Sequence, residues 1–144
     1  MDFLTAMRIS GSALKAERMR INIDAMNLAN VNTTRTMEGG PYRAKSVVFA
    51  ARPLEGGFAA SLDAAARRLR KVEVVEVVED DKPFKEVFDP SHPDADENGI
   101  VRLPNVDPAE QMIDLLEARR SYGANVTAIE TAKGLALRAL DIAK

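Results

Sequence analysis

The sequence predicts an elongated α+β protein whose long N- and C-terminal helices pair as an antiparallel coiled coil beside a small antiparallel β middle domain. Near both ends of the chain, apolar side chains recur at alternating steps of three and four, which is a helix signature. Between these ends lie short runs rich in Val, Ile, Phe and Tyr, separated by Pro, Gly and Asp, which is typical of strands. Because both helices leave one small β region, their simplest arrangement is antiparallel and side by side.

The N-terminal helix is expected from about Phe3 to Ala29, where the chain has no proline and a single glycine. Its apolar row is narrow, which indicates the seam of a coiled coil and not the broad face of a globular helix. The helix therefore requires a partner helix, and the side chains predicted to face it are Leu4, Met7, Leu14, Ile21 and Leu28. The segment 30–41, rich in Asn, Thr and Gly, is expected to be a loop.

The middle of the chain contains four strand-like runs, YRAKSVVFAA, KVEVVEVV, PFKEVF and GIVRL. They predict a small antiparallel sheet. In the second run, Val72 and Val74 fall on one face of a regular strand and Val75 and Val77 on the other, so either a bulge intervenes or both faces are covered. The segment FAASLDAAARRLR, between the first two runs, is compatible with a short helix or with a mobile excursion.

A second long helix is expected to begin at Asp107, which supplies an N-cap acid, followed by Pro108 at the first helical position and Glu110 at the third. The alternation of three and four then continues almost to Lys144. The side chains predicted to face the partner helix are Met112, Leu115, Tyr122, Val126, Ile129 and Leu140. These residues and the corresponding five of the N-terminal helix are called the predicted seam, a surface expected to mediate assembly.

Three charged residues, Arg18, Arg119 and Lys133, occupy positions in the same apolar rows. Charge at such positions weakens a simple two-stranded coil but can specify partners in a larger assembly. The rows therefore indicate association with more than one other helix.

The chain has 144 residues, the size of one ordinary domain, and the patterns divide it into three regions. We predict an N-terminal axial helix in 1–35, a small β-rich middle domain in 36–106 and a C-terminal axial helix in 107–144. The two helices are expected to form one discontinuous helical domain.

The composition excludes several classes of function. The 20 basic and 22 acidic side chains nearly cancel, so no overall positive field attracts nucleic acid. Cysteine is absent, which removes thiolate zinc sites, thiol nucleophiles and disulfides. The first residues lack the basic region and long apolar run of a cleaved secretory signal, and no stretch approaches the roughly 18 apolar residues of a membrane helix. We expect no cofactor, no metal and no small-molecule substrate.

One polar segment, Asp94 to Gly99, matches the first half of a calcium-binding loop. The twelfth position of such a loop requires a bidentate glutamate, but here it is Asn105, and the preceding Pro104 opposes an immediate second helix. A polar Asn-Gly turn leading into the strand GIVRL explains the segment better.

His92 is the single histidine of the chain and lies between a serine and a proline. No second imidazole or thiolate accompanies it, so a structural turn residue is the default interpretation. The alternative is that His92 acts as a general acid or base together with Asp89 or Asp94, but no nucleophile motif supports it. We therefore expect no enzyme.

The N-terminal helix ends in a recognisable motif, within the stretch SALKAERMRINIDAMNLANVNTT. This stretch resembles the signature of flagellar rod and hook proteins, in which a helix ends in an Asn-Leu-Ala-Asn core followed by threonine. The motif residues here are Asn27, Asn30 and Thr33. The asparagines are interpreted either as hydrogen-bonding register pins or as helix-end and surface residues, and for Asn30 and Asn32 capping is at least as good an explanation.

The C-terminal helix carries a second motif, in the stretch EQMIDLLEARRSYGANVTAIETAKGL. It is similar to the signature at the other end of the same proteins, and its motif residues are Ala118, Arg120, Tyr122 and Asn125. Asn125 lies in mid-helix, which favours an interface role. Two family signatures at opposite ends of one chain are hard to obtain by chance.

A third stretch, PSHPDADENGIVRLPNVDP, resembles the segment that marks the proximal rod proteins within this family. The chain departs from the family pattern at Ile100, where an aromatic is frequent, at Gln111, which precedes the methionine, and at Gly123, where an acid is frequent. No motif is matched between about residues 50 and 70.

The resemblance implies a structural subunit that polymerises with copies of itself and with other rod proteins into a tubular rod. It further implies export by the flagellar type III apparatus without a cleaved signal peptide, and a place in the flagellar basal body, in the periplasm. The alternatives are another axial protein of the flagellum, such as a different rod or hook protein, and an unrelated coiled-coil adaptor.

Overall fold

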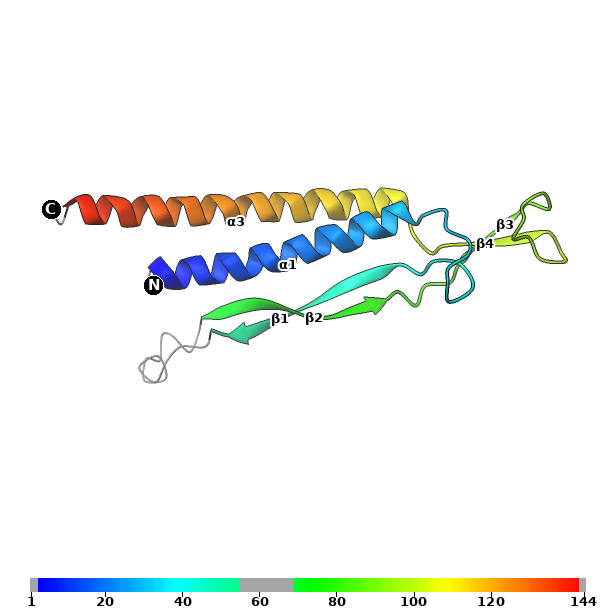
Figure 1. The fold of residues 1–144 in the computed structure, drawn as a ribbon, viewed down its shortest axis with the longest axis horizontal. Coiled ribbons are helices and arrows are strands. Elements are labelled where there is room, and N and C mark those ends of the chain that lie inside the picture. Colours follow the sequence, from blue (N-terminus) through cyan, green and yellow to red (C-terminus); the bar gives the residue numbers. More distant parts are fainter. Residues whose placement is uncertain (1–2, 55–68, 143–144) are drawn as a thin grey trace.

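A computed structural model describes residues 3–54 and 69–142 and shows an elongated molecule in three layers (Figure 1). Helix α1 lies between helix α3 and a long β-hairpin, and a shorter hairpin projects from one end. The elements, in chain order, are α1 (Phe3–Ala29), β1 (Lys45–Pro53), β2 (Arg70–Glu79), β3 (Lys85–Phe88), β4 (Ile100–Leu103) and α3 (Pro108–Ile142). The alternatives stated above for residues 58–68 lie outside the described residues.

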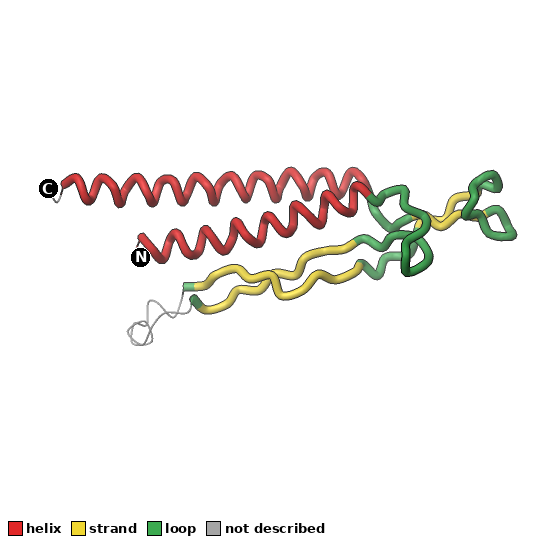
Figure 2. Tube along the Cα trace, in the orientation of Figure 1, coloured by secondary structure: helices red, strands yellow, loops and turns green. Residues whose placement is uncertain are grey.

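The two long helices run antiparallel and lie side by side, with both chain ends at the same end of the molecule (Figure 1). The predicted start of α3 is confirmed, because Asp107 Oδ1 accepts a hydrogen bond of 2.9 Å from the backbone N–H of Ala109. Helix α3 has 35 residues against 27 in α1, so its C-terminal part extends past the start of α1 (Figure 2). The α+β class with paired terminal helices is confirmed, whereas the boundaries of the three regions remain a prediction.

The strands pair antiparallel, as predicted, but they form two separate two-stranded sheets, β1–β2 and β3–β4, instead of one. The link between β2 and β3 explains the interruption. Asn105 Nδ2 donates hydrogen bonds of 3.0 Å to the carbonyls of Asp80 and Lys82, and Arg43 Nη1 donates one of 2.8 Å to the Asp80 carbonyl. Because these carbonyls bond side chains, they do not continue the ladder of β2.

The β1–β2 hairpin contains a bulge, the first of the two alternatives stated for the valine-rich run. Strand β2 carries one extra residue, Val75, opposite the step between Val48 and Phe49 of β1. Residues directly opposite each other share a face of the sheet, so the extra residue returns Val77 to the face that holds Val74. The bulge thereby places several apolar side chains on one face of the hairpin. The hairpin as a whole packs along α1.

The compact core lies at the joint, defined as the place where α1 ends, β1 starts and α3 starts. Tyr42, Ala44 and Val106 form this buried cluster, and the partly buried Val31 packs against it. Away from the joint, the helices and the hairpin are only partly covered by the chain itself. The molecule is therefore rigidly connected at one place and extended elsewhere.

Candidate assembly interface

Asn27, in the last turn of α1, connects three elements at the joint. Its side chain is 1% exposed. Nδ2 donates to the Lys45 carbonyl at 2.7 Å and to Gln111 Oε1 at 2.8 Å, while Oδ1 accepts from Tyr42 Oη and from the Lys45 N–H, both at 2.9 Å. Every donor and acceptor of the amide is thus used within the chain. The register-pin interpretation applies to Asn27, but inside one subunit.

The departure from the family pattern at Gln111 has a structural consequence, since Gln111 is the α3 partner of Asn27. An uncharged amide accepts the Asn27 hydrogen bond without bringing an ionised group into the joint. Asn105, 8% exposed, makes the neighbouring connection by accepting from the Ala44 N–H at 2.8 Å. The sequence analysis treated Asn105 as the position where a calcium-loop glutamate is lacking and as part of the stretch PSHPDADENGIVRLPNVDP, and it assigned this residue no contact.

The remaining motif residues have local roles within the described chain. Asn30 donates to the Met26 carbonyl at 2.9 Å and accepts from Thr33 Oγ1 at 3.1 Å, which matches the capping interpretation. Asn125 donates to the carbonyl of Ser121 in its own helix, at 2.9 Å. Ala118 is fully buried, whereas Tyr122 is partly buried and Arg120 is exposed.

No residue of the predicted seam is buried. Leu4, Met112 and Leu140 are exposed to 61%, 52% and 63%. The other predicted seam residues are partly buried: Met7, Leu14, Ile21, Leu28, Leu115, Tyr122, Val126 and Ile129. The helix pair alone therefore leaves much of this apolar surface in contact with water, and the role of the seam in assembly remains a prediction.

Sequence reasoning missed further exposed apolar side chains on α3. Ile113 and Leu116 lie near Met112 in its first turns, and three others lie near its C-terminal end: Leu135, Leu137 and Ile142. The second group lies close to the end of α3 at Ile142. These residues lie outside a single three-four row, so a search restricted to that row could not select them.

A charged cluster, also missed, lies between the two long helices. Arg20 Nη2 lies 3.1 Å from Asp114 Oδ1 and 3.6 Å from Glu117 Oε2, both on α3. Arg20 Nε lies 3.9 Å from Oδ2 of Asp24, one helical turn further along α1. The spacing of Arg20 and Asp24 is visible in the sequence, but the contribution of α3 depends on how the helices dock.

Asp24 is an unusual member of that cluster because it is 8% exposed. Burial raises the pKa of its carboxyl to about 6, Arg20 opposes this increase, and the negative charges of Asp114 and Glu17 add to it. Two buried carboxylate oxygens, Asp24 Oδ2 and Glu17 Oε2, have no hydrogen-bond partner in the described part of the chain. The cluster is thus short of positive charge.

The segment that resembled a calcium loop forms hydrogen-bonded turns. Asp96 Oδ1 accepts from the N–H groups of Asn98 and Ile100, and Gly99 has a φ of 75°, as a glycine turn requires. Asp94 Oδ2 accepts from Thr34 Oγ1 at 2.7 Å. Within residues 3–54 and 69–142, no three acidic, His or Cys side chains are placed to hold a metal ion.

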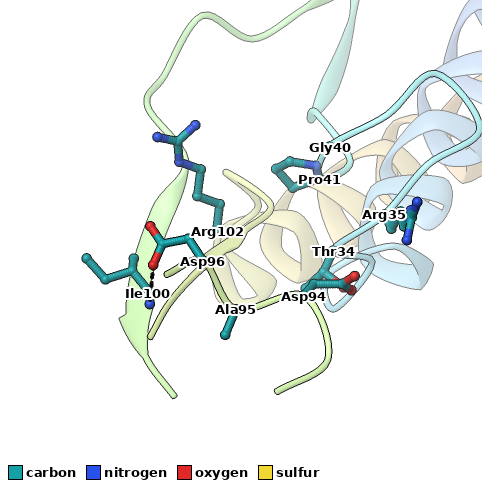
Figure 3. A pocket seen from close by; sticks show the side chains of 9 residues that line it. All are labelled: Thr34, Arg35, Gly40, Pro41, Asp94, Ala95, Asp96, Ile100 and Arg102. Carbon is teal, nitrogen blue, oxygen red and sulfur yellow. Dashed lines mark hydrogen bonds between the residues drawn. The ribbon is translucent and has the colours of Figure 1, made fainter. Parts of the chain in front are cut away.

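An open hollow of about 500 Å³ lies between this loop and the segment that follows α1 (Figure 3). Its polar side chains each interact with a different partner. Asp94 accepts a hydrogen bond from Thr34, Asp96 accepts one from the Ile100 N–H, and Arg102 forms an ion pair with Glu86 at 3.5 Å. Elsewhere in the turn, His92 Nδ1 accepts from the Asp94 N–H at 3.1 Å. These groups do not converge on one point, and this is the arrangement of a turn rather than of a reaction centre.

Among the helices of the described residues, none is both long and apolar enough to cross a membrane.

Comparison with known proteins agrees with the geometry at both ends of the chain. Residues 7–35 match the family model "Flagella basal body rod protein", and these residues include most of α1 and its Asn-rich end. Residues 97–142 match the model "Flagellar basal body rod FlgEFG protein C-terminal", which covers β4 and α3. The paired terminal helices are thus those of an axial protein of the bacterial flagellum.

Full-length relatives define the family more narrowly. The chain is 39% identical to flagellar basal-body rod protein FlgC of Bacillus subtilis, over 96% of this chain and 97% of the relative. It is 39% identical to FlgC of Salmonella typhimurium and 37% identical to FlgC of Borreliella burgdorferi, in both cases over 99% of this chain and 98% of the relative. The chain belongs to the FlgC family of flagellar basal-body rod proteins, and it is a structural subunit of that rod.

Proposed function

We propose that this protein polymerises, with copies of itself and with other rod proteins, into the tubular drive shaft that transmits motor torque to the hook. The observation that carries the proposal is the incomplete burial of the predicted seam along two long, paired helices. Apolar surface of this extent favours association, since each fully buried Leu, Ile or Val side chain contributes about 1.5–3 kcal/mol. Neighbouring subunits would supply the missing cover.

The shape of the subunit suits this mechanical role. At about 1.5 Å per residue, α3 spans roughly 50 Å, and the joint around Asn27 connects it firmly to α1 and β1. In an assembled rod the helices would pack along the axis and carry torque through many parallel contacts. No chemical turnover belongs to this mechanism, and we propose that the protein is not an enzyme.

The route to the rod is part of the proposal. We infer export through the flagellar type III apparatus with an uncleaved N-terminus, followed by assembly in the periplasmic part of the basal body. Support comes from the family to which the chain belongs.

A deletion strain tests the proposed function directly. Loss of the gene is expected to abolish swimming and to leave basal bodies without a complete rod in electron micrographs, and the wild-type gene is expected to restore both. An epitope-tagged chain should also co-purify with basal bodies. Normal swimming and normal rods in the deletion strain would contradict the proposed function.

A further inference from the structure

The carboxylate cluster between the long helices, defined as Glu17, Asp24, Asp114 and Glu117 around Arg20, has more negative than positive charge. The carboxylates of Asp24, Asp114 and Glu117 all pair with the one guanidinium of Arg20, and Glu17 adds a further negative charge that acts on Asp24. Arg20 lies closest to Asp114, at 3.1 Å, and is 3.9 Å from Asp24. One cation therefore serves several anions and pairs poorly with the most buried of them.

Two carboxylate oxygens of the cluster show the same shortage. Asp24 Oδ2 and Glu17 Oε2 are buried and accept no hydrogen bond in the part of the chain that the structure describes. A buried acceptor without a partner is costly, and more so when it is charged. The raised pKa of Asp24 has burial as its main cause, and its acidic neighbours add to it. The cluster thus has capacity for a second cation.

The outer rim of the cluster is open to a partner. The side chain of Glu117 is 67% exposed and that of Asp114 is 35% exposed, whereas that of Asp24 is 10% exposed. A cation from outside can pair with the two α3 carboxylates at the rim. Arg20 would then be released toward Asp24 and compensate the buried charge.

The cation that fits is a basic side chain. Within the described ranges no group of three acidic, His or Cys residues is close enough to hold a metal ion, whereas an Arg guanidinium matches carboxylates spread over a rim. Helix α1 itself presents such a side chain, Arg18, which is exposed. Among the described residues Arg18 makes no ion pair.

Helix geometry separates this side chain from the cluster of its own subunit. Arg18 and Arg20 are two residues apart, or about 200° around the helix, so they point in nearly opposite directions. One face of α1 thus carries an exposed cation, and the opposite side carries the cation-poor cluster. A contact between these two different faces would be a heterologous interface. Such an interface can repeat from copy to copy and builds rings or helical assemblies.

We propose that the carboxylate cluster of one subunit binds Arg18 of a neighbouring copy of this chain. This inference rests on the proposed function, because it assigns a partner residue to a contact in the assembled rod. Electrostatic pairing of this kind would set the register of the contact, while apolar seam residues supply most of its area. Glu117 at the rim is the first partner that the incoming side chain meets.

Cysteine cross-linking tests the contact, because the natural chain has no cysteine. A strain lacking its own subunit would produce two differently tagged chains, one with Arg18→Cys and the other with Glu117→Cys. After mild oxidation of purified basal bodies, we expect a disulfide between the two tags. The matched control pairs Glu117→Cys with Arg138→Cys, an exposed arginine far along α3, and should give no mixed product. Absence of the mixed disulfide, with both chains present in the basal bodies, would overturn the proposal.

A charge exchange provides the second measurement. Arg18→Glu and Glu117→Arg are each expected to reduce swimming toward the level of the deletion strain, and the double variant should restore it. Circular dichroism of the purified single variants would show that each still folds. Wild-type swimming by both single variants overturns the site. Defective single variants without restoration in the double variant assign the cation to a different rod protein and overturn the second copy as partner.

Failure of this inference is distinguishable from failure of the proposed function. If the tagged wild-type chain is absent from basal bodies, the protein is not a rod subunit there. If it is present but neither cross-link nor charge restoration is seen, only the Arg18 contact is wrong.

Discussion

Asn27 of α1 donates a hydrogen bond of 2.8 Å to Oε1 of Gln111 on α3, and this contact joins the last turn of one long helix to the first turn of the other. The same amide also bonds β1 and Tyr42. This family motif residue therefore holds the end of α1 against both β1 and the start of α3.

Asn27→Ala should destabilise the isolated subunit by about 3 kcal/mol, because it leaves a buried group of Tyr42 and partly buried groups of Lys45 and Gln111 without partners. Urea unfolding followed by circular dichroism measures this change. Asn32→Ala is the matched control, since Asn32 is exposed, and it should change stability by less than about 0.5 kcal/mol. Equal midpoints for the two variants would show that the hydrogen bonds of Asn27 do not hold the joint.

Asp24 should make the subunit more stable in mild acid than at neutral pH. Its pKa is raised to about 6 in the folded protein from 3.8, so the native state binds the proton more tightly than the unfolded state. Stability from this group is therefore lost as pH rises from about 4 to 6, by at most about 3 kcal/mol.

Asp24→Asn removes the titrating carboxyl and should abolish that part of the pH dependence. The measurement is the free energy of unfolding at several pH values between 4 and 7. Glu130→Gln serves as control, because Glu130 is exposed on α3 and does not belong to the charged cluster, and its pH dependence should remain that of the wild type. An unchanged slope in Asp24→Asn would contradict the assignment.

Leu28→Asp and Val126→Asp should each block rod assembly, because a charge without a partner costs several kcal/mol where neighbouring chains cover the seam. Both side chains are partly buried within the subunit. Rods would be counted in electron micrographs, and swimming would be scored in soft agar. Ala128→Asp introduces the same charge at an exposed position of α3 and should assemble. Normal swimming by either seam variant would count against the seam.

Two glycine substitutions should have opposite effects on stability. A Cβ at Gly99, whose φ is 75°, would lie 2.9 Å from Pro90 Cγ, so Gly99→Ala should destabilise by about 1–3 kcal/mol. A Cβ at Gly123, in α3, has nothing within 4 Å, and Gly123→Ala should stabilise by up to about 1 kcal/mol. Urea unfolding compares both with the wild type, and the same sign for the two changes would contradict the argument.

The ends of the long helices should exchange amide hydrogens much faster than the joint in the isolated subunit. Leu4 and Leu140 are mostly exposed, whereas Val106 is buried in the core cluster. Mass spectrometry of deuterated peptides distinguishes these regions. Strong, uniform protection along α1 and α3 would mean that the subunit needs no neighbours for order.

The elements that sequence patterns predicted well are those defined by neighbouring residues. The start of α3 follows from Asp107 and Pro108, since capping acts within one turn. The extent of α1 follows from a repeat that obeys the helical period. The bulge was one of two stated alternatives, because strand periodicity signals an irregularity without identifying its cause.

Docking of distant segments decided the rest. The Asn27–Gln111 bond joins residues 84 positions apart, and the Arg20–Asp114 pair joins residues 94 apart, so both depend on how the helices settle against each other. The separation of the strands into two sheets likewise depends on where Asn105 and Arg43 meet the Asp80 carbonyl. Helical periodicity predicts which side chains share a face of a helix. Only the packed structure shows which segment contacts that face, because the contact joins parts of the chain that no local pattern connects.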